Sequence, residues 1–394
     1  MKTPHPRPDF LSRIALLAAL LCSGTVFAQT RYHVEELESL GGNNARGNSI
    51  NDFGIASGYS TVTDNTVRHA AAWFLGRKFD LGTLGDPRTS NSTVPWPVKN
   101  LGGLIVGISQ TDIDDPNQEL WSCFYFFSGP HANNGKACRG FAWERGRMRQ
   151  LLPLSGGTHS FAAGANNLGE IVGWAENAVV DNTCVAPQKL QFKPVIWGPG
   201  RRAARALPLV GDDTSGAATA INDRGQIVGI SGICDIAVGR YSAAHAVLWD
   251  GGRVIALDGF DAPYWNTPNA INQRGDIVGF MGTPGDADGN LLRAFIRIHG
   301  SDVVRQISPL QGDAYATAQS INESRQVVGT SCKEGAVDCR AFLWENGITH
   351  DISRQPGYDG VLTGAQDINN FGVITGRAVD AGGVRKAFVA VPVH

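Results

Sequence analysis

The feature of this sequence that most constrains its fold is a hairpin motif that occurs seven times. In the copy "SGAATAINDRGQIVGISG", an apolar segment ends in Asn, and glycines follow three and seven residues later. The Asn residues lie 47 to 66 residues apart and are Asn51, Asn100, Asn166, Asn222, Asn272, Asn322 and Asn369. The glycines seven residues later are Gly58, Gly107, Gly173, Gly229, Gly279, Gly329 and Gly376. Only Arg325 replaces the glycine at the third position. Asn bonds its own backbone and Gly adopts positive φ, so the motif predicts a tight turn between two strands.

Each copy continues with a second pair of short apolar segments. "HAVLW", ending at Trp249, is followed by a glycine turn and "RVIALDGFD", and similar pairs follow most other Asn turns. One copy therefore predicts four strands, which we name a to d, with the Asn turn between a and b. Four antiparallel strands in about 45–50 residues are typical of a propeller blade.

The two ends of the repeat region predict a closed ring. The segment "RYHVEELESLGG" resembles strand d with no a, b or c before it, and the last copy stops at strand c in "RKAFVAVPVH". An N-terminal strand would complete the last blade, whereas an open solenoid would need capping repeats. We therefore expect an all-β, seven-bladed β-propeller with four antiparallel strands per blade, in which Tyr32–Gly41 pairs beside Lys386–Val393.

Several of these motifs also carry a family resemblance. "AAHAVLW", "CRAFLW" and "RAFI", together with "AINDRGQIVG", resemble the HAF-repeat family of extracellular, β-propeller-like proteins. The resemblance covers nearly all of the chain after its first segment. It implies the repeat architecture and an exported location, and it implies no particular activity.

The N-terminal segment has the pattern of a signal peptide. A basic start, the apolar run "IALLAALLCSGTVFA" and small residues before Gln29 predict a signal peptide at 1–28 and one propeller domain at 29–394. Cys22 raises a lipoprotein alternative, although bulky Leu21 precedes it. No second apolar span follows, so we expect a secreted or periplasmic monomer without an integral membrane segment.

Charge and cysteine usage narrow the function classes. The 394-residue chain has a formal net charge of -2, which argues against a nucleic-acid partner. After Cys22, six cysteines remain, an even number that suggests disulfides in an exported chain. We expect Cys123–Cys138 and Cys332–Cys339 to tie b–c connections to their own strand c, and Cys184–Cys234 follows by elimination.

Loop length separates the two faces of the expected propeller. The a–b turns are short and alike, whereas the b–c connections vary widely, and b–c and d–a connections emerge on the same side. Binding sites favour variable loops on a rigid frame, so this side is the candidate binding face. Aromatic residues in its loops predict ligand contacts, with a small satellite core as the alternative; they are Trp96, Trp121, Tyr264 and Trp265.

Other polar residues were weighed as ligands or catalytic groups. "GDADGN" offers Asp286, Asp288 and Asn290 as oxygen ligands, so calcium is the one cofactor that we consider. A basic residue begins every strand c, and we interpret it, like the repeated Asn, as part of the frame. The chain lacks H-E-x-x-H, G-x-S-x-G and P-loop motifs.

We therefore expect a binding or scaffold protein whose ligand is a glycan or a surface protein, rather than an enzyme. The alternative is a polysaccharide hydrolase or lyase with carboxylates at the channel mouth, such as Asp112, Asp114 or Asp367. A purely structural protein of the cell envelope is the third hypothesis.

Overall fold

Each repeated turn is built by the side chain of its own Asn. Asn222 Oδ1 accepts hydrogen bonds from the backbone N of Arg224 and of Gln226, both at 3.1 Å. Gly225 completes the turn with φ of 75°. Arg325 adopts φ of 61° at the same position of copy six, so this residue takes the left-handed conformation without being glycine.

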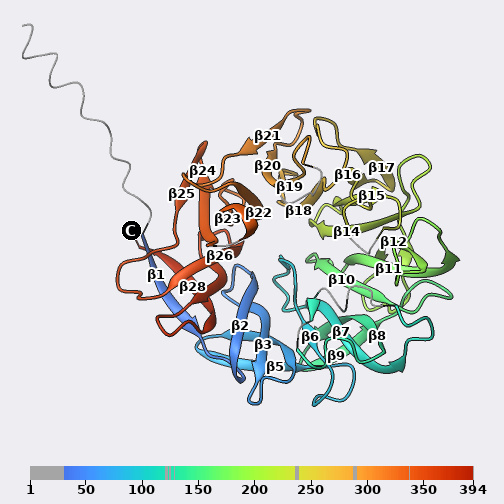
Figure 1. Ribbon diagram of the computed structural model, residues 1–394, viewed down its shortest axis with the longest axis horizontal. Helices are drawn as coiled ribbons and strands as arrows, with labels where there is room; N and C mark the ends of the chain where they lie inside the picture. Colours follow the sequence, from blue (N-terminus) through green and yellow to red (C-terminus); the bar gives the residue numbers. More distant parts are fainter. Residues whose placement is uncertain are drawn as a thin grey trace, which may run out of the picture. The chain divides into compact units, whose positions relative to one another are not determined.

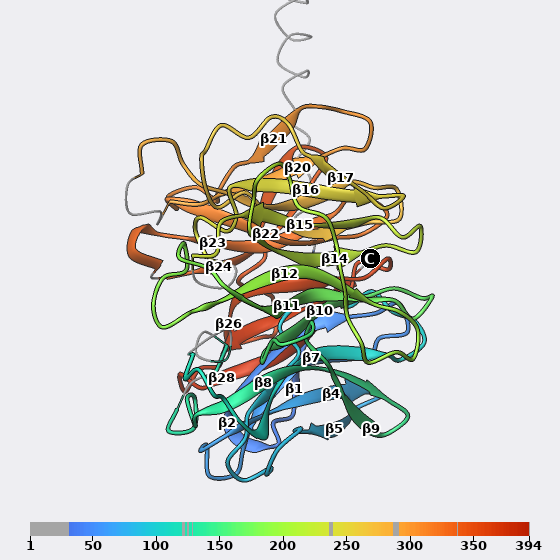
Figure 2. The same cartoon turned by 90° about the vertical axis from the view of Figure 1, so that its right-hand side faces the viewer.

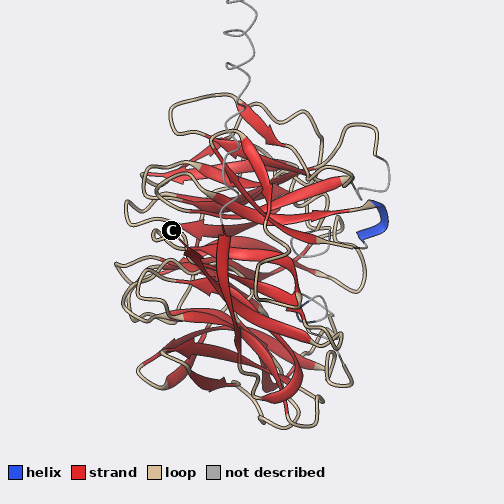
Figure 3. Cartoon of the chain, turned by 90° about the vertical axis from the view of Figure 1, so that its left-hand side faces the viewer, coloured by secondary structure: helices blue, strands red, loops and turns tan. Residues whose placement is uncertain are grey.

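The computed structural model describes residues 31–119, 123, 126–127, 129–235, 239–286, 291–336 and 338–393. Arg31–His394 forms one compact unit. Among the described residues, the short 3₁₀ turn η1 (Glu334–Ala336) is the one helix with assigned bounds, Cys123 and Phe126 are also helical, and the rest is strand and loop (Figure 3). The predicted signal peptide at 1–28 lies outside the described residues.

The described strands form five four-stranded sheets and one eight-stranded sheet, whose two halves are joined by a parallel bridge between Asn44 and Arg385. With the two halves counted separately, there are seven four-stranded antiparallel ladders, which we number in the order of their Asn turns. Ladder 1 is β2 (Gly41–Ile50), β3 (Ala56–Val62), β4 (Arg68–Phe74) and β5 (Arg77–Gly82). Ladder 2 is β6 (Ser92–Thr93), β7 (Ile105–Asp114), β8 (Lys136–Glu144) and β9 (Arg147–Leu151). Ladder 3 is β10 (Ser160–Ala165), β11 (Ile171–Val180), β12 (Leu190–Trp197) and β13 (Arg205–Ala206). Ladder 4 is β14 (Ser215–Ile221), β15 (Ile227–Gly232), β16 (His245–Asp250) and β17 (Arg253–Ala256).

The remaining ladders follow the same order of strands a to d. Ladder 5 is β18 (Thr267–Ile271), β19 (Ile277–Met281), β20 (Arg293–Arg297) and β21 (Val304–Ile307). Ladder 6 is β22 (Tyr315–Ile321), β23 (Val327–Cys332), β24 (Arg340–Glu345) and β25 (Ile348–Asp351). Ladder 7 is β26 (Val361–Ile368), β27 (Ile374–Val379), β28 (Arg385–Val393) and β1 (Arg31–Leu37).

Ladder 7 is completed by the N-terminal strand. β1 pairs antiparallel with β28, from Arg31 opposite Val393 to Leu37 opposite Ala387. The colours of Figures 1 and 2 show the same return, with blue β1 beside red β28. The expected pairing over Tyr32–Gly41 is therefore correct up to Leu37, whereas Gly41 begins β2. Each ladder contacts the next, and ladder 7 contacts ladder 1, so the predicted all-β propeller fold is confirmed.

The second repeated glycine accommodates a bulge in strand a. In six ladders the register of strand a shifts directly opposite this glycine. A Cβ on Gly229 would lie 2.0 Å from the backbone O of Ala217. The glycine is therefore required by the close approach of strand a, because any side chain would collide with a backbone carbonyl.

The seven Asn side chains join the ladders into a ring. Each Asn donates from Nδ2 to the backbone O of the Asn in the next ladder, and Asn369 closes the series onto Asn51 at 3.1 Å. All seven residues are buried. Each Asn side chain thus forms hydrogen bonds with its own turn and with the neighbouring ladder, which supports the interpretation of the Asn residues as part of the frame.

Candidate functional site

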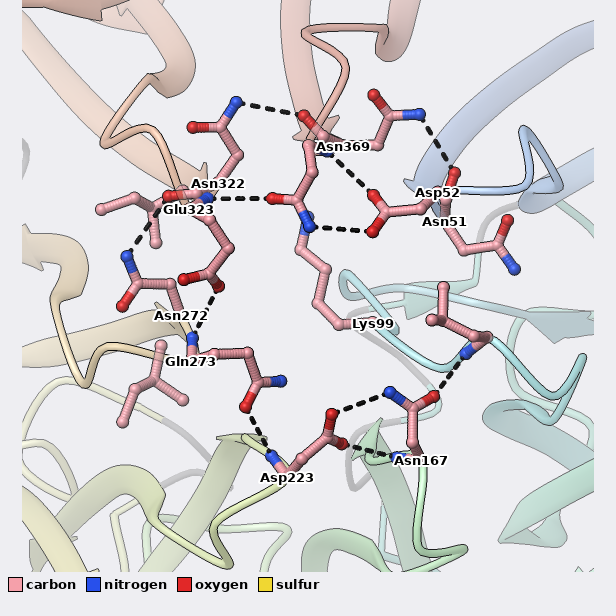
Figure 4. A pocket seen from close by; sticks show the side chains of 14 residues that line it. Asn51, Asp52, Lys99, Asn167, Asp223, Asn272, Gln273, Asn322, Glu323 and Asn369 are labelled. Carbon is pink, nitrogen blue, oxygen red and sulfur yellow. Dashed lines mark hydrogen bonds between the residues drawn. The ribbon is translucent and has the colours of Figure 1, made fainter.

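The ladders present two faces with different chemistry. We call the side with the a–b turns the turn face and the side with the b–c and d–a connections the loop face. A cavity of about 180 Å³ opens at the centre of the turn face (Figure 4). Its polar lining comes largely from the residues that follow each Asn, together with Lys99.

The polar groups of the turn-face cavity bond to one another. Glu323 accepts a hydrogen bond from the backbone N of Gln273 at 2.7 Å, and corresponding bonds link most neighbouring ladders (Figure 4). Leu101 interrupts this second ring, because its side chain cannot accept from Asp52. The Lys99 amine lies 2.5 Å from Oδ1 of buried Asp367, which belongs to ladder 7. This cavity is therefore part of the frame, and Asp367 is neutralised by Lys99.

The loop face carries arginines of ladders 1 and 7 that lie close together. We call Arg46, Arg68, Arg377 and Arg385 the arginine cluster. The Arg68 guanidinium stacks 4.5 Å above the ring of Tyr59, and Tyr59 lies opposite Arg46 in the β2–β3 pair. Arg385 begins β28 beside Asn44 of β2, and Arg377 Nε donates to Thr363 at 3.1 Å.

Three of the four arginines of this cluster have no carboxylate partner in the described part of the chain. Among the described residues, Arg46, Arg377 and Arg385 form no ion pair, and Arg46 Nε is buried without a hydrogen-bond partner. Burial lowers the pKa of Arg46 to about 10, and Arg377 and Arg68 lower it further against the opposing effect of Tyr59. A partly buried cation beside other cations is costly, and an anion bound at this site would lower that cost.

The sequence contained a signal for this cluster that the analysis of single motifs missed. Cross-strand pairs at one level of strands a and b are small, apolar or hydroxyl-bearing in ladders 3 to 6; they are Phe161 with Trp174, Ala217 with Ile230, Thr267 with Phe280, and Thr317 with Thr330. At the same level, ladder 1 has Arg46 with Tyr59 and ladder 7 has Gly364 with Arg377. Comparison of the copies position by position would have identified these two charges.

Three of the basic residues that begin strand c form ion pairs with d–a connections. Arg340 binds Asp351 at 2.6 Å and Asp313 at 3.0 Å, and His245 lies 2.9 Å from Asp213. Arg293 pairs with Asp261 in ladder 5. Because Asp213, Asp261 and Asp313 all lie in d–a connections, these ion pairs anchor the connections to strand c.

The structure describes three of the four aromatic residues predicted to bind ligand. Trp96 is partly buried, lies at the level of strand a rather than in the d–a connection, and packs against Phe126, Phe161 and Trp174 with ring centroids 5.6 to 6.0 Å away. Tyr264 is buried below Arg240, whose guanidinium lies 3.9 Å from its ring.

Trp265 is partly buried and lies 6.2 Å from Phe280, whereas Trp121 is outside the described residues. The satellite-core alternative therefore accounts for Trp96 and Tyr264, because both rings are covered by other side chains. Ligand contacts by Trp265 and Trp121 stay predictions.

The predicted calcium ligands are described only in part. Asp286 Oδ2 accepts a hydrogen bond from the backbone N of Leu291 at 2.6 Å, while Asp288 and Asn290 lie outside the described residues. Of the acids in the enzyme alternative, Asp114 pairs with Lys136 and Asp112 accepts from the backbone N of Asp86. Calcium binding stays a prediction.

All three predicted disulfides are present. Cys123–Cys138 and Cys332–Cys339 each close a b–c connection onto strand c, and Cys184–Cys234 joins ladders 3 and 4. Disulfides of this kind are typical of oxidising compartments outside the cytosol.

A buried carboxylate cluster lies beneath the long b–c connection of ladder 2. The acceptor atoms of Asp115, Glu119 and His159 lie within 4.8 Å of one another. His159 Nδ1 accepts a hydrogen bond from the backbone N of Cys138 at 3.0 Å, which assigns the proton of a neutral ring to Nε2, 3.2 Å from Asp115. Neither nitrogen then has a lone pair for a metal, so this donor set does not fit a metal ion.

The same cluster joins two loops instead. Glu119 Oε1 accepts hydrogen bonds from the backbone N of Lys189 and Leu190, in the b–c connection of ladder 3. Glu176 accepts from the backbone N of Thr158 and of His159. These bonds hold the longest connections of ladders 2 and 3 together under the loop face.

Comparisons with known proteins support the fold alone. No protein-family model matches the chain, and no curated protein sequence matches it. The chain is similar to the β-propeller domain of the Trilobed protease from Pyrococcus furiosus, with 9% identity, 92% of this chain and 93% of that chain covered, and a TM-score of 0.50.

Two further solved structures are similar at a lower level. Pyrococcus horikoshii acylaminoacyl peptidase matches with 11% identity over 93% of this chain and 52% of its own, with a TM-score of 0.44, so the chain spans about half of that enzyme. An oligogalacturonate lyase from Vibrio parahaemolyticus matches with 9% identity over 92% and 91%, with a TM-score of 0.41. Membership of the HAF-repeat family stays a prediction.

The described part of the chain contains no helix with the length and apolar character needed to cross a membrane.

Proposed function

We propose that this chain is an exported binding protein whose loop face takes an anionic ligand at the arginine cluster. The observation that carries the proposal is Arg46, a partly buried guanidinium that neighbours Arg377 and Arg68 and has no carboxylate partner in the described structure. Guanidinium groups bind carboxylate, sulfate and phosphate through paired N–H donors. An acidic glycan or an acidic segment of a surface protein would each supply such groups.

The rigidity of the surrounding frame supports binding at this face. The Asn ring joins the ladders to one another, the ion pairs of strand c hold the d–a connections, and the Cys332–Cys339 disulfide closes the b–c connection of ladder 6. Arginines held in fixed positions lose little entropy when a ligand arrives. The export part of the proposal rests on the predicted signal peptide and agrees with the three disulfides.

The test is calorimetric titration of the purified chain with acidic oligosaccharides and with their neutral methyl esters, at low and high salt. We expect the acidic forms alone to bind, with an affinity that falls as salt rises. Arg46→Gln and Arg377→Gln should each weaken binding by about tenfold or more, since one charge-assisted bond contributes about 1.5–3 kcal/mol. The matched control is Arg224→Gln, which removes an exposed arginine from the turn face and should leave binding unchanged.

The free energy of unfolding of the Arg46→Gln variant provides a second measurement, which distinguishes a binding role of Arg46 from a structural one. If Arg46 serves an absent ligand, Arg46→Gln relieves repulsion and leaves the free energy of unfolding equal or higher. A large loss of stability in Arg46→Gln, or equal binding of acids and esters, contradicts the proposal.

A further inference from the structure

A groove between ladders 6 and 7 extends the arginine cluster outward along the loop face. This groove has a volume of about 680 Å³ and is lined by Arg354, Arg377 and Arg385, together with side chains of ladder 6. Arg377 and Arg385 belong to both the groove and the cluster. The two features therefore form one continuous surface rather than two separate sites.

Some basic side chains along this surface already have a carboxylate partner, whereas others do not. In ladder 6, Arg340 is bound by Asp313 and Asp351, and Lys333 by Asp338. In contrast, the Arg354 side chain donates only to the backbone O of Gly360, at 3.4 Å, among the described contacts. Arg377 and Arg385 likewise have no carboxylate partner there.

The unneutralised arginines are thus Arg46, Arg377, Arg385 and Arg354, spread from strand a of ladder 1 to the connection that enters ladder 7. A small anion would satisfy one or two of these guanidinium groups and leave the others unpaired. A chain with repeated anionic groups would reach them together, and each later contact then forms at high effective concentration.

The groove also contains carboxylates and neutral polar groups, which decide the class of ligand. Asp313 and Asp338 line it beside Gln311 and Thr363. The Asp313 side chain is buried and paired with Arg340, and Asp338 is paired with Lys333, so both carboxylates already have partners. Gln311 and Thr363 are neutral groups of the lining that can form hydrogen bonds with hydroxyl groups. A ligand with carboxylates for the arginines and hydroxyls for Gln311 and Thr363 matches both parts of the lining. An acidic polypeptide such as polyglutamate has no such hydroxyl donors.

From these observations we infer that the loop face binds an oligosaccharide of uronic acids, several sugars long, along the surface from Arg46 to Arg354. The inference rests on the proposed function and adds the ligand class and the extent of the site. The carboxylate of a uronic acid is attached directly to a rigid ring, so its presentation to fixed guanidinium groups costs less entropy than that of a flexible side chain.

The experiment measures affinity against ligand length in the full chain. The probes are galacturonic acid as monomer, trimer and hexamer, the methyl-esterified hexamer, and polyglutamate of similar length. We expect the hexamer to bind at least about a hundredfold more tightly than the monomer, as linked contacts predict. The esterified hexamer and polyglutamate should bind at least about tenfold more weakly than the acidic hexamer.

Two variants separate the inference from the proposed function. Arg354→Gln should weaken hexamer binding about tenfold and leave monomer binding unchanged, whereas Arg46→Gln should weaken both. Equal affinity for monomer and hexamer, or no effect of Arg354→Gln while Arg46→Gln still abolishes acid binding, overturns the inference and leaves the proposed function standing. Tighter binding of polyglutamate than of the hexamer overturns the ligand class. Failure of Arg46→Gln to weaken any acidic probe overturns both proposals.

Discussion

At the scale of single residues, two buried ionisable groups of this chain meet opposite constraints. Arg46 cannot lose its proton near neutral pH and lies partly buried beside Arg377, so under the proposed function an anionic ligand offsets the cost of this charge. Glu176 can take up a proton, and burial raises its pKa to about 7, with His159 opposing and nearby Glu119 adding to the shift. The arginine is therefore suited to binding, whereas the glutamate links stability to pH.

The first prediction concerns Glu176→Gln. Between its ordinary pKa of 4.5 and its folded value of about 7, Glu176 keeps a proton that the unfolded chain releases. Its stabilising contribution is therefore full below pH 4.5 and is lost as pH rises to about 7. The amide avoids this loss, so the variant should gain up to about 3 kcal/mol relative to the parent over that range, at about 1.4 kcal/mol per pKa unit.

Urea unfolding at several pH values measures this difference. The Glu176→Gln side chain keeps an acceptor for the backbone N of Thr158 and of His159, so these two contacts are preserved, whereas the bond that Gln188 Nε2 donates to the second oxygen at 3.2 Å is lost. Glu144→Gln, which changes an exposed carboxylate, is the matched control. A constant difference between Glu176→Gln and the parent across the range contradicts the prediction.

At the scale of the strand, the repeat is defined by the geometry of one bulge. Strand a brings a carbonyl oxygen against the middle of strand b in every ladder, within 1.9 to 2.1 Å of where a Cβ would stand. The glycine seven residues after each Asn is therefore a packing requirement. The glycine three residues after the Asn is instead a requirement of backbone conformation, with φ of 75° at Gly225.

The second prediction compares two Gly→Ala changes in ladder 4. Gly229→Ala places a methyl group 2.0 Å from Ala217 O, which forces the strands apart and should lower the free energy of unfolding by about 3 kcal/mol. Gly251→Ala, in an open turn with φ of 56°, should cost only about 1 kcal/mol from backbone strain. Chemical denaturation checks both, and equal losses would show that the bulge tolerates a side chain.

The sequence predicted where the strands of these ladders lie better than it predicted which side chains form the candidate binding site. Asn and Gly recur at fixed spacing because turn and bulge impose them on each copy, so periodicity revealed both. Trp96 was assigned to a loop because Pro95 and Pro97 interrupt the strand pattern, and β6 is indeed only Ser92–Thr93. Arg46 and Arg377 were missed because they approach one another only when the first and last ladders meet.

At the scale of the whole molecule, neighbouring ladders are joined by Asn side chains that serve two ladders each. Asn222 caps its own turn through Oδ1 and donates from Nδ2 to Asn272 O at 3.1 Å. Lys99 adds a link that passes over ladder 1, from ladder 2 to Asp367 of ladder 7. The turn face is consequently closed by polar bonds between ladders.

The third prediction separates the two roles of Asn222. Asn222→Asp keeps the acceptor for the turn and removes the donor to ladder 5, so it should cost about 1–3 kcal/mol from the buried carbonyl left unpaired. Asn222→Ala loses both roles and should cost more. Asn43→Asp, on an exposed side chain, is the control for the change in charge. Thermal unfolding that is unchanged in Asn222→Asp would show that the ring bond contributes nothing.

The pairing of β1 with β28 has a consequence for how the chain reaches its native state. The first strand to emerge during synthesis finds its partner only when the last strand has appeared. Until β28 is made, the edge of β1 is unpaired, and Tyr32 lacks the residues against which it packs. A chain of this design therefore keeps one seam open until β28 has been made, and a chaperone that shields that seam would act on β1 and on β28.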